Sequence, residues 1–534
     1  MFEKIFFITS YLVLVLLQCF VFWYGMRYNV HMLQQNSYKN KGHMKWLKEN
    51  FSRQRFLLIG TVPLVLTAVL GDHGVAVIIS AAFGVLVAVG YVAQKRNNTK
   101  KKLVFTNRVK RLIVCDLVVN GILTAIPAVV FFLADGGKAA LRAGTTALVL
   151  LNLLEPLCLV LCNILMKPVE KHINNGFIKD AKKILKENKD LIVIGVTGSY
   201  GKTSLKFFLK ELLSVKFNVL ATPESFNTPM GVVKTIRESL RQTDDIFICE
   251  MGAKHVGDIK EICDIVHPAH GVITSVGPQH LETFKTIENV RKTKFELAEA
   301  LPAGGKLFVN FDSEEARKQE GNYNRIVYGI EDRTGCYAKD ISLSPLGTDF
   351  TVVTPDGEEE RFHMRLIGYV NVLNVLGAIT VAHSFGIPLE ELKVPVRRLI
   401  PVSHRLELRE HGNFTIIDDA YNSNPVGSKA AVETLKDFDG VRILITPGMV
   451  ELGEKEDELH YKFGTYAAPC CDYILLVNRY RTKEIKRGAL ESGFPEDRLF
   501  EFDKFTEAMD FACTRIKDDR HRFILLENDL PDNF

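Results

Sequence analysis

The sequence predicts an α-helical membrane domain followed by two α/β domains. Long apolar runs recur through the first 170 residues, and a strand, a glycine-rich turn and a helix then follow one another between Ile192 and Val215. From there to the C-terminus, short apolar strand candidates alternate with helical stretches, which is typical of mainly parallel sheets covered by helices. We therefore expect a transmembrane domain at 1–170, an amphipathic linker helix at 171–187, a central α/β domain at 188–402 and a smaller, doubly wound α/β domain at 403–534.

Composition narrows the class of protein. The length of 534 residues suggests roughly three or four domains, in line with this division. The formal net charge is only +4, so the balance of charge indicates no nucleic-acid partner. The ten cysteines form no C-x-x-C pair, and Cys470 and Cys471 are adjacent. This pattern favours reduced thiols in a cytosolic or membrane setting over a disulfide framework or a zinc ribbon.

Five apolar runs predict the membrane domain. Most approach the roughly 20 residues that cross a hydrocarbon core of about 30 Å. The second run is short and is joined to the third by a tight turn, so this pair forms either a hairpin or a re-entrant element. The first run lacks a small-residue cleavage pattern and is expected to be a retained anchor. The runs are Ile5–Tyr24, Phe56–Leu70, Val75–Ala93, Leu112–Ala134 and Thr145–Met166.

Basic residues predict the orientation of this domain. They concentrate between the first and second runs and between the third and fourth, whereas the other two loops hold only Lys138 and Arg142. The positive-inside rule then places the N-terminus outside and everything after Lys167 in the cytoplasm. We expect a multi-pass protein of the cell membrane, in contact with its lipid, whose α/β domains are cytoplasmic.

Four polar side chains lie inside the last two apolar runs: Asp116, Asn120, Asn152 and Glu155. Acidic groups in a membrane are costly and often functional. Polar contacts between helices, near the kink expected at Glu155-Pro156, would explain them equally well. The sequence leaves both interpretations open.

The stretch from Ile192 to Ser204 predicts a phosphate-binding loop. A strand leads into a glycine turn and then into the N-terminus of a helix, which together form a nest of backbone N–H groups for phosphate oxygens. Val196 stands where the usual pattern begins with glycine, so the motif shortens to G-x-x-G-K-T, and an ordinary glycine turn is the alternative. In the predicted loop Lys202 reaches the β- and γ-phosphates of a nucleoside triphosphate and Thr203 binds Mg²⁺. The loop consists of Gly198, Ser199, Tyr200, Gly201, Lys202, Thr203 and Ser204.

Polar residues gather where the predicted strands end. Glu250 closes the strand Ile246–Glu250, and His280 follows the next strand. Lys294 lies fourteen residues after His280, on a helix expected to start near Ile287. Ligands of open α/β sheets bind beyond the carboxyl ends of the strands. The expected strands are Phe217–Ala221, Ile246–Glu250, Gly271–Ser275, Lys306–Asn310 and Arg325–Tyr328, then Phe414–Ile417, Arg442–Ile445 and Tyr473–Val477.

A series of motifs resembles the Mur ligase family, and within it the branch that adds D-alanyl-D-alanine. The similarity runs from about Leu191 to near the C-terminus, in the order of the family. Its motifs are Thr197-Gly-Ser-Tyr-Gly-Lys-Thr, Glu224-Ser-Phe-Asn-Thr-Pro-Met-Gly, Glu250-Met-Gly-Ala-Lys-His, Thr274-Ser-Val-Gly-Pro-Gln-His-Leu-Glu, Gly368-Tyr-Val-Asn-Val-Leu-Asn, Ser403-His-Arg-Leu-Glu, Ile417-Asp-Asp-Ala-Tyr-Asn-Ser-Asn-Pro and Gly448-Met-Val-Glu-Leu-Gly.

The resemblance implies ATP and two Mg²⁺ ions as cofactors. Thr203 and Glu250 would hold one Mg²⁺ and His280 a second, although a histidine there is also consistent with a hydrogen-bonded loop. Lys294 matches a lysine that some relatives carbamylate, and a solvated helix lysine is its alternative. The catalytic set implied is Lys202, His280, Lys294 and Arg405.

The resemblance also implies nucleotide and substrate contacts. Asn371 and Asn374 would contact adenine or merely cap a helix, and the family usually has histidine where Val370 stands. Arg405 would clamp the γ-phosphate, and Asp419 would contact the ribose or the metal shell unless Asp418-Asp419 is a solvated turn. Asn310 would line the nucleotide cleft. The amino-acid or dipeptide pocket would include Ser225, Asn227, Thr228, Tyr421, Asn422 and Asn424.

Together these residues indicate an ATP-dependent, amide-forming ligase of peptidoglycan biosynthesis that acts through an acyl phosphate. It would add an amino acid or a D-Ala-D-Ala-like dipeptide to a muropeptide or to a polyprenyl-linked acceptor, and the sequence does not choose between these acceptors. The alternatives are a membrane-bound poly-γ-glutamate synthase-like ligase, a non-catalytic ATP-binding scaffold and a transporter. The match to the dipeptide-adding loops disfavours the first, and the full set of metal and phosphate residues disfavours the second. Five crossings without an ABC-type signature sequence disfavour the third.

Overall fold

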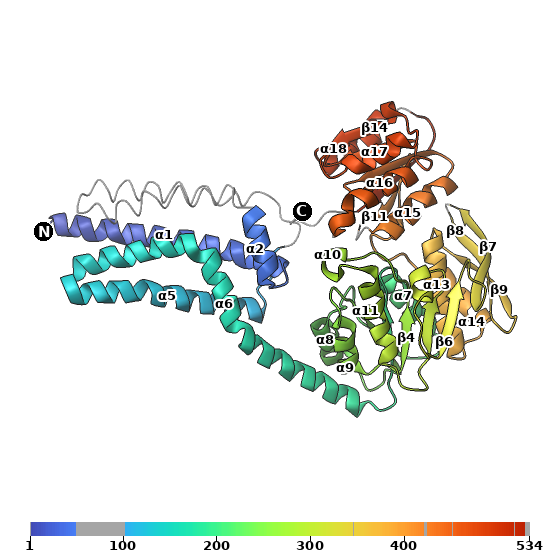
Figure 1. The fold of residues 1–534 in the computed structure, drawn as a ribbon, viewed down its shortest axis with the longest axis horizontal. Coiled ribbons are helices and arrows are strands. Elements are labelled where there is room, and N and C mark those ends of the chain that lie inside the picture. The colour runs from blue at the N-terminus through green and yellow to red at the C-terminus, as the bar shows by residue number, and fades with distance from the viewer. Residues whose placement is uncertain are drawn as a thin grey trace. The chain divides into compact units, whose positions relative to one another are not determined.

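The computed structural model describes residues 2–49, 102–344, 346–420, 424–450, 452–516 and 518–528 (Figure 1). The chain divides into two compact units. One comprises Met1–Asn175 with Pro531–Phe534, and the other is Gly176–Leu530. The predicted membrane domain corresponds to the first unit, and both predicted α/β domains lie in the second.

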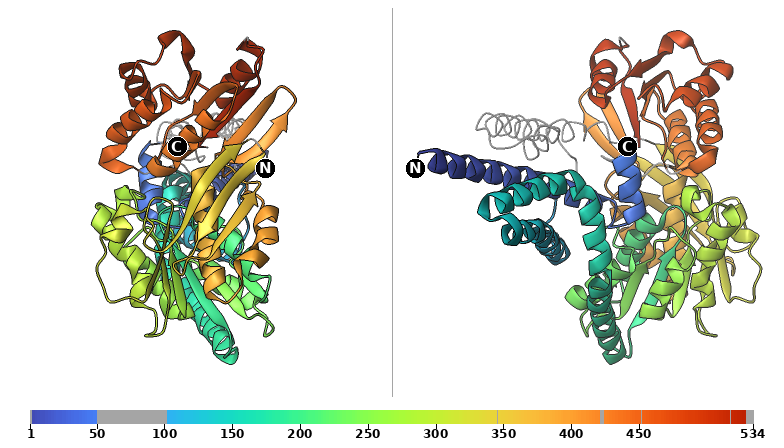
Figure 2. Two further views of the ribbon diagram at one scale, coloured as in Figure 1. Left: turned by 90° about the vertical axis from the view of Figure 1, so that its right-hand side faces the viewer. Right: turned by 60° about the vertical axis from the view of Figure 1, so that its left-hand side comes forward.

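The described part of the first unit is helical. Helix α1 lies alongside α5 and α6, as the views of Figure 2 show. Pro156 and Pro168 lie within α6, which continues without a break through the predicted linker. Gly136 alone separates α5 from α6, so most of the expected loop Asp135–Gly144 is helical. The helices are α1 (Phe2–Gln35), α2 (Asn40–Glu49), α5 (Asn107–Asp135) and α6 (Gly137–Glu187).

Two of these helices are long and apolar enough to cross a membrane. They are α5, at Asn107–Asp135, and the Ala139–Glu187 part of α6. They contain the fourth and fifth predicted runs, and the first run lies within α1. The runs Phe56–Leu70 and Val75–Ala93 lie outside the described residues.

Two of the polar side chains in the apolar runs, Asn152 and Glu155, join one helix to another. Asn29 of α1 donates to the Glu155 carboxylate of α6. Asn152 Nδ2 donates to Gln18 Oε1 at 2.6 Å, again between α6 and α1. These contacts support the helix-contact interpretation of Asn152 and Glu155.

The second unit begins with the last turns of α6, which pack on the central domain. Ala181 is buried in that domain's core, and Arg237 forms an ion pair with Asp180 at 2.6 Å. The central domain has a nine-stranded sheet in the order β2-β3-β1-β4-β5-β6-β7-β8-β9. Strands β1 to β7 pair in parallel, and β7, β8 and β9 form an antiparallel edge. The strands are β1 (Ile192–Thr197), β2 (Val219–Ala221), β3 (Ile246–Glu250), β4 (His270–Ile273), β5 (Leu307–Asn310), β6 (Arg325–Gly329), β7 (Cys336–Ser344), β8 (Gly347–Val353) and β9 (Glu359–Met364).

Helices cover both faces of this sheet because its central strands are apolar on both sides. Ile194 and Val196 of β1 pack with α7, α13 and α14, whereas Val193 faces the core formed with α8, α9 and α11. The helices are α7 (Lys202–Leu213), α8 (Pro229–Ser239), α9 (Asp258–Val266), α10 (Leu281–Phe284), α11 (Ile287–Glu299), α12 (Glu314–Arg317), α13 (Tyr369–Ser384) and α14 (Leu389–Arg398).

The C-terminal domain has a six-stranded sheet in the order β10-β11-β15-β12-β13-β14, with only β10 antiparallel. The last of the described strands, β15, therefore lies at its centre. The strands are β10 (Glu407–His411), β11 (Phe414–Asp419), β12 (Val441–Thr446), β13 (Tyr473–Val477), β14 (Leu499–Phe502) and β15 (Arg522–Glu527). The helices are α15 (Pro425–Thr434), α16 (Glu456–Ala467), α17 (Lys483–Glu491) and α18 (Phe505–Asp510), with short turns η1 (Leu435–Asp437), η2 (Gly453–Lys455), η3 (Glu496–Arg498) and η4 (Phe511–Arg515).

Candidate active site

The turn between β1 and α7 has the backbone that a phosphate-binding loop requires. Gly198 has φ 151°, and Gly201 adopts the left-handed conformation at φ 77° as the N-cap of α7. A Cβ atom at Gly201 would lie 2.4 Å from Asn374 Oδ1, and one at Gly198 would lie 2.0 Å from Thr274 Oγ1. Only glycine fits at either position. The predicted strand, glycine turn and helix N-terminus are confirmed.

The phosphate loop rests against the segment that follows β4. Ser199 N donates to Ser275 O at 2.8 Å, and Ser199 Oγ donates to Gly277 O at 3.0 Å. The Tyr200 hydroxyl donates to Pro278 O at 2.8 Å. The structure thus brings together two motifs that lie more than 70 residues apart.

Lys202 lies over this loop. Its Nζ donates to Gly198 O at 2.6 Å and to Ser199 O at 3.0 Å. Burial lowers the pKa of Lys202 to about 8, while the charge of Glu250 raises it and that of Arg405 lowers it further. A negatively charged phosphate at this position would favour the protonated lysine.

Glu250, at the end of β3, lies next to the first residues of α7. Its Oε1 accepts hydrogen bonds from Thr203 Oγ1 at 3.0 Å and from Asn227 Nδ2 at 3.1 Å. Its Oε2 lies 3.0 Å from Lys206 Nζ. Burial tends to raise the pKa of Glu250, but Lys206 and Lys202 outweigh it and hold the pKa below its ordinary value. The carboxylate is therefore charged.

The Thr203–Glu250 pair fits a hard divalent cation. A hydroxyl and an ionised carboxylate oxygen lie 3.0 Å apart at the phosphate loop, and Mg²⁺ prefers oxygen ligands supplied by one or two protein groups together with phosphate. His280, the other predicted metal residue, is the N-cap of α10 with φ 52°. It lies two residues beyond Pro278, which contacts Tyr200 of the loop.

Lys294 is buried in α11, with 1% of its surface exposed. Burial lowers its pKa well below the ordinary value, and the nearby charge of Lys202 lowers it further. The solvated-lysine alternative is therefore wrong. Burial therefore favours the neutral form of the Lys294 amine.

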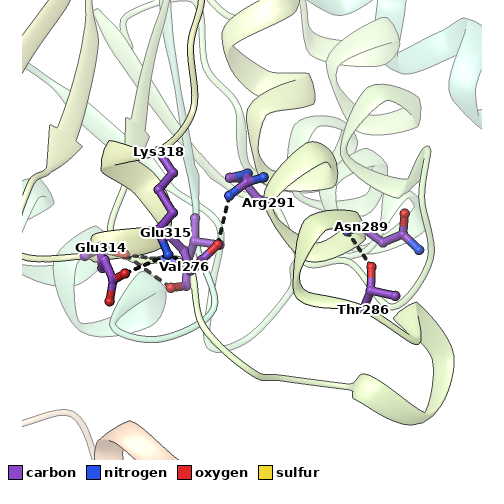
Figure 3. A network of polar contacts seen from close by, with 8 residues as sticks. Val276, Thr286, Asn289, Arg291, Glu314, Glu315 and Lys318 are labelled. Atoms are coloured by element: carbon purple, nitrogen blue, oxygen red, sulfur yellow. Dashed lines mark hydrogen bonds and ion pairs between the residues drawn. The ribbon is translucent and has the colours of Figure 1, made fainter.

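Figure 3 shows how α11 is held in place. Thr286 caps the helix by accepting a hydrogen bond from Asn289 N, and Arg291 forms an ion pair with Glu315 of α12 at 2.9 Å. Ser313, at the start of α12, accepts a hydrogen bond from Val276 N. These contacts connect the helix that carries Lys294 to the segment packed on the phosphate loop.

The predicted nucleotide-contact asparagines differ in their surroundings. Asn374 lies against Gly201 of the phosphate loop. Asn371 Nδ2 donates to Ile367 O at 2.9 Å in the first turn of α13, which favours its local structural role. Asn310 is also structural, because its Nδ2 donates to Thr274 O at 2.8 Å and its Oδ1 accepts from Asp312 N at 2.9 Å.

Arg405 and Asp419 of the C-terminal domain are electrostatically coupled to each other. Burial raises the pKa of Asp419 to about 6, whereas the charge of Arg405 lowers it. The same arginine lowers the pKa of Lys202, so its charge also acts on the phosphate loop. Asp419 Oδ1 accepts a hydrogen bond from Leu406 N at 3.3 Å.

The neighbouring Asp418 has a different role. It is buried, makes a hydrogen bond with His404 Nδ1 at 2.8 Å and forms an ion pair with Arg409 at 3.1 Å. His404, Glu407 and Asp418 are close enough to hold a cation, but Arg409 already supplies a positive charge to both carboxylates. The solvated-turn alternative for Asp418-Asp419 is wrong.

The predicted substrate residues are partly engaged in structural contacts. Thr228 caps α8 and Asn424 caps α15 through their side-chain oxygens. Asn227 reaches Glu250, and Ser225 lies in the same loop. Tyr421 and Asn422 lie outside the described residues.

The sequence-based interpretation overlooked two residues, Lys206 and Glu527. Lys206 is one helical turn after Lys202, which places it on the same side of α7. Glu527 is buried at the end of β15, where its carboxylate accepts hydrogen bonds from Ser428 Oγ at 2.6 Å and Thr446 Oγ1 at 3.0 Å. A short apolar run that ends in glutamate, as in Ile246–Glu250, is the signal that would have identified Glu527.

Comparison with known families agrees with this geometry. The Mur ligase middle domain matches residues 196–382, and the Mur ligase, glutamate ligase domain matches residues 404–526. The chain is 30% identical over 312 residues to the UDP-N-acetylmuramoyl-tripeptide–D-alanyl-D-alanine ligase of Bacillus subtilis (strain 168), covering 58% of this chain and 66% of the relative. It is 32% identical over 297 residues to the ligase of the same name from Escherichia coli (strain K12), covering 54% and 64%. The chain thus spans just under two thirds of these relatives.

Solved structures show the same fold. The MurF ligase from Thermotoga maritima in complex with ADP is similar with a TM-score of 0.60 and 25% identity, covering 67% of this chain and 81% of that one. A crystal structure of MurF from Acinetobacter baumannii is similar with a TM-score of 0.59 and 25% identity, covering 67% and 77%. The α/β part of the chain therefore has the fold of these ligases.

Proposed function

Residues 196–526 belong to the Mur ligase family, and we propose on this basis that the chain is an ATP-dependent ligase of peptidoglycan biosynthesis. It joins D-alanyl-D-alanine, or a related amine, to the peptide of a muropeptide acceptor. The observation that carries this proposal is the phosphate loop with Lys202 above it and the Thr203–Glu250 pair beside it. The names of the Bacillus subtilis and Escherichia coli relatives support the choice of acceptor and dipeptide.

The chemistry begins with phosphoryl transfer. A carboxylate oxygen of the acceptor attacks the γ-phosphorus of ATP, and ADP leaves with the electrons of the broken bond. The amine then attacks the acyl carbon and loses a proton as inorganic phosphate departs. Catalysis of the first step rests on positioning and on neutralising charge. Lys202 and Arg405 are suited to this because both positive charges act at the phosphate loop.

Magnesium would add a further positive charge beside the transferred phosphate. Thr203 and Glu250 would hold one ion, and His280 a second. The chain's own residues prepare this site by holding the ionised Glu250 between two hydrogen-bond donors, Thr203 and Asn227, and the cation of Lys206. Asn374 and Asp419 are proposed to contact the nucleotide, and Asn227 links the metal carboxylate to the substrate loop.

We further propose that Lys294 is carbamylated. A neutral amine attacks CO₂, forming a carbamate and releasing a proton, and burial lowers the pKa of Lys294 in favour of the neutral form. Labelling with carbon-13 bicarbonate should give a carbamate signal that is lost in Lys294→Ala. Absence of the signal from active protein would overturn the carbamylation proposal and leave the ligase proposal intact.

The direct test of the ligase proposal is ADP release by the purified full-length chain. ATP, Mg²⁺ and D-alanyl-D-alanine are supplied with the UDP-linked muramoyl tripeptide. Release of ADP that requires both acceptor and dipeptide, with formation of the pentapeptide product, is the expected result. ATP turnover without either substrate, or no turnover with any acceptor and amine pair, contradicts the proposal.

The membrane-type helices support a second candidate for the acceptor. Because α5 and part of α6 are long and apolar enough to cross a bilayer, an acceptor carried on a polyprenyl lipid would be presented at the cytoplasmic face of the membrane. The same assay with a lipid-linked muropeptide separates the two acceptors. Turnover confined to the UDP-linked substrate rules out the lipid acceptor.

A further inference from the structure

Lys206 is a buried cation at the carboxylate proposed to bind magnesium. It is fully buried, with no exposed surface, and so is Glu250. Its Nζ lies 3.0 Å from Glu250 Oε2. Thr203 and Asn227 contact the other oxygen of the carboxylate, Oε1. Both oxygens of Glu250 are therefore engaged before any metal arrives.

The second contact of Lys206 is with the substrate loop. Its Nζ donates to the carbonyl oxygen of Glu224, a residue with positive φ at the start of the segment that leads to Asn227. Asn227 in turn donates to Glu250 Oε1, and its carbonyl accepts from Gly252 N at 2.8 Å. Lys206 thus joins three elements: α7, the end of β3 and the loop before α8.

We propose that Lys206 is a positioning residue that makes metal binding depend on the nucleotide. It orients Glu250 so that Oε1 faces Thr203, and its positive charge opposes a second cation at the same carboxylate. This inference rests on the proposed ATP and Mg²⁺ chemistry and assigns a role that the phosphate-loop motif itself does not require. The phosphates of ATP supply the negative charge that outweighs Lys206, so the ion binds with the nucleotide and only weakly without it.

Electrostatics explains why this contact matters. Like charges near one carboxylate repel strongly where water is excluded, because the effective dielectric constant is low. An unpaired carboxylate at this position would attract a divalent ion by itself. Because Lys206 pairs with the Glu250 carboxylate, the buried negative charge is compensated while the nucleotide site is empty.

The test measures Mn²⁺ binding to the purified full-length chain by electron paramagnetic resonance, with and without a non-hydrolysable ATP analogue. Wild-type protein should bind Mn²⁺ weakly alone and far more tightly with the analogue. Lys206→Met should bind Mn²⁺ alone at least tenfold more tightly than wild type, and the effect of the analogue should shrink accordingly. Lys206→Arg, which keeps the charge, should behave as wild type.

Two controls make the result specific. Lys210→Met changes a lysine of the same helix, one turn further on, and should leave Mn²⁺ binding unchanged. Adding Glu250→Gln to Lys206→Met should abolish the gained binding, which places the ion at Glu250. If Lys206→Met does not fold, Lys206→Gln retains a donor for the Glu224 carbonyl and provides the same measurement.

Mn²⁺ affinity of a folded Lys206→Met or Lys206→Gln variant within twofold of wild type overturns the inference. A merely structural lysine would give that outcome together with a lower melting temperature. Failure of wild type to bind the ATP analogue at all would instead contradict the proposed function. The two failures are therefore distinguishable.

Discussion

Lys202 and Glu250 show how single residues carry the chemistry of the site. Each is charged, and each is placed where the surrounding protein disfavours charge unless a partner compensates it. Burial lowers the pKa of Lys202 to about 8, and Lys206 and Lys202 together keep Glu250 ionised. The site is consequently poised to gain from an arriving polyphosphate and its cation.

Lys202→Ala removes the cation nearest to the phosphate loop. We expect kcat for ADP release to fall by about 100- to 1,000-fold, because one charge that stabilises the phosphoryl-transfer transition state is lost. Steady-state kinetics of the purified full-length chain measure this change. Lys210→Ala is the matched control, since it also changes a lysine of α7 but lies two turns from the loop. Activity of Lys202→Ala within threefold of wild type would contradict the assigned role.

Glu527, in the C-terminal domain, is a buried carboxylate with a structural role. Glu527→Leu removes the acceptor of the Thr446 hydroxyl and one of the two acceptors of the Ser428 hydroxyl, which also bonds Asn424 O at 2.7 Å. We expect it to lower the free energy of unfolding of this domain by about 2 kcal/mol. Hydrogen exchange of the β12 and β15 amides measures this loss. Glu501→Leu breaks a partly exposed pair with Lys486 and should cost less than about 1 kcal/mol. Equal losses in the two variants would show that the buried network is not stabilising.

At the scale of elements, most apolar parallel strands were predicted, whereas the antiparallel edge β7 to β9 and the central strand β15 were not. The run Ile246–Glu250 is apolar on both faces, and the structure gives it the predicted bounds as β3. Strands β7 to β9 carry charged residues throughout, such as Lys339 and Glu359, because one face of this antiparallel edge meets solvent. Their sequence therefore lacks the continuous apolar signal.

The site was predictable to the extent that its residues follow strands. The rule that ligands bind beyond strand ends led to Glu250 and to the segment before His280, and the latter packs on the phosphate loop. Lys206 could not be recognised, because a lysine in a helix reads as solvated until the fold shows that it is buried. Asn424 illustrates the opposite case. Motif similarity assigns this residue to the substrate pocket, but in the structure its side chain caps α15.

Helix α16 carries a pH-sensitive contact beneath the Gly448-Met449 turn. His460 Nε2 accepts a hydrogen bond from Met449 N at 2.9 Å, and burial lowers the pKa of His460 to about 4. In the unfolded chain His460 has its ordinary pKa near 6.5 and binds a proton, which the buried imidazole of the folded domain does not bind. The contribution of His460 to the free energy of unfolding should be fully present above pH 6.5. It should fall by up to about 3 kcal/mol as the pH drops to 4.

Chemical unfolding of wild type and His460→Gln across pH 4 to 7 tests this contribution. The difference between their free energies of unfolding should shrink as the pH falls through this window, because glutamine does not titrate. Other groups titrate equally in both proteins, so their contributions cancel in the difference between the two free energies of unfolding. A difference that stays constant with pH would exclude His460 as the origin.

At the scale of the whole molecule, we propose that one compact unit anchors the chain and the other carries out the chemistry. The helical unit contains α5 and most of the apolar part of α6, and the α/β unit contains every described residue of the proposed site. The proposed reaction consumes ATP and therefore requires that second unit to lie in the cytoplasm. The basic residues flanking the predicted runs give the same orientation by an independent argument.

This agreement predicts how the chain lies in a cell. It should stay with the membrane fraction after an alkaline wash, because apolar helices of this length are held by hydrocarbon and not by surface charge. In spheroplasts treated with external protease, a tag at the N-terminus should be removed while a tag after Phe534 is protected. Lysis should expose both tags. Cleavage of the C-terminal tag in intact spheroplasts would place the ligase domains away from ATP and contradict both the orientation and the proposed reaction.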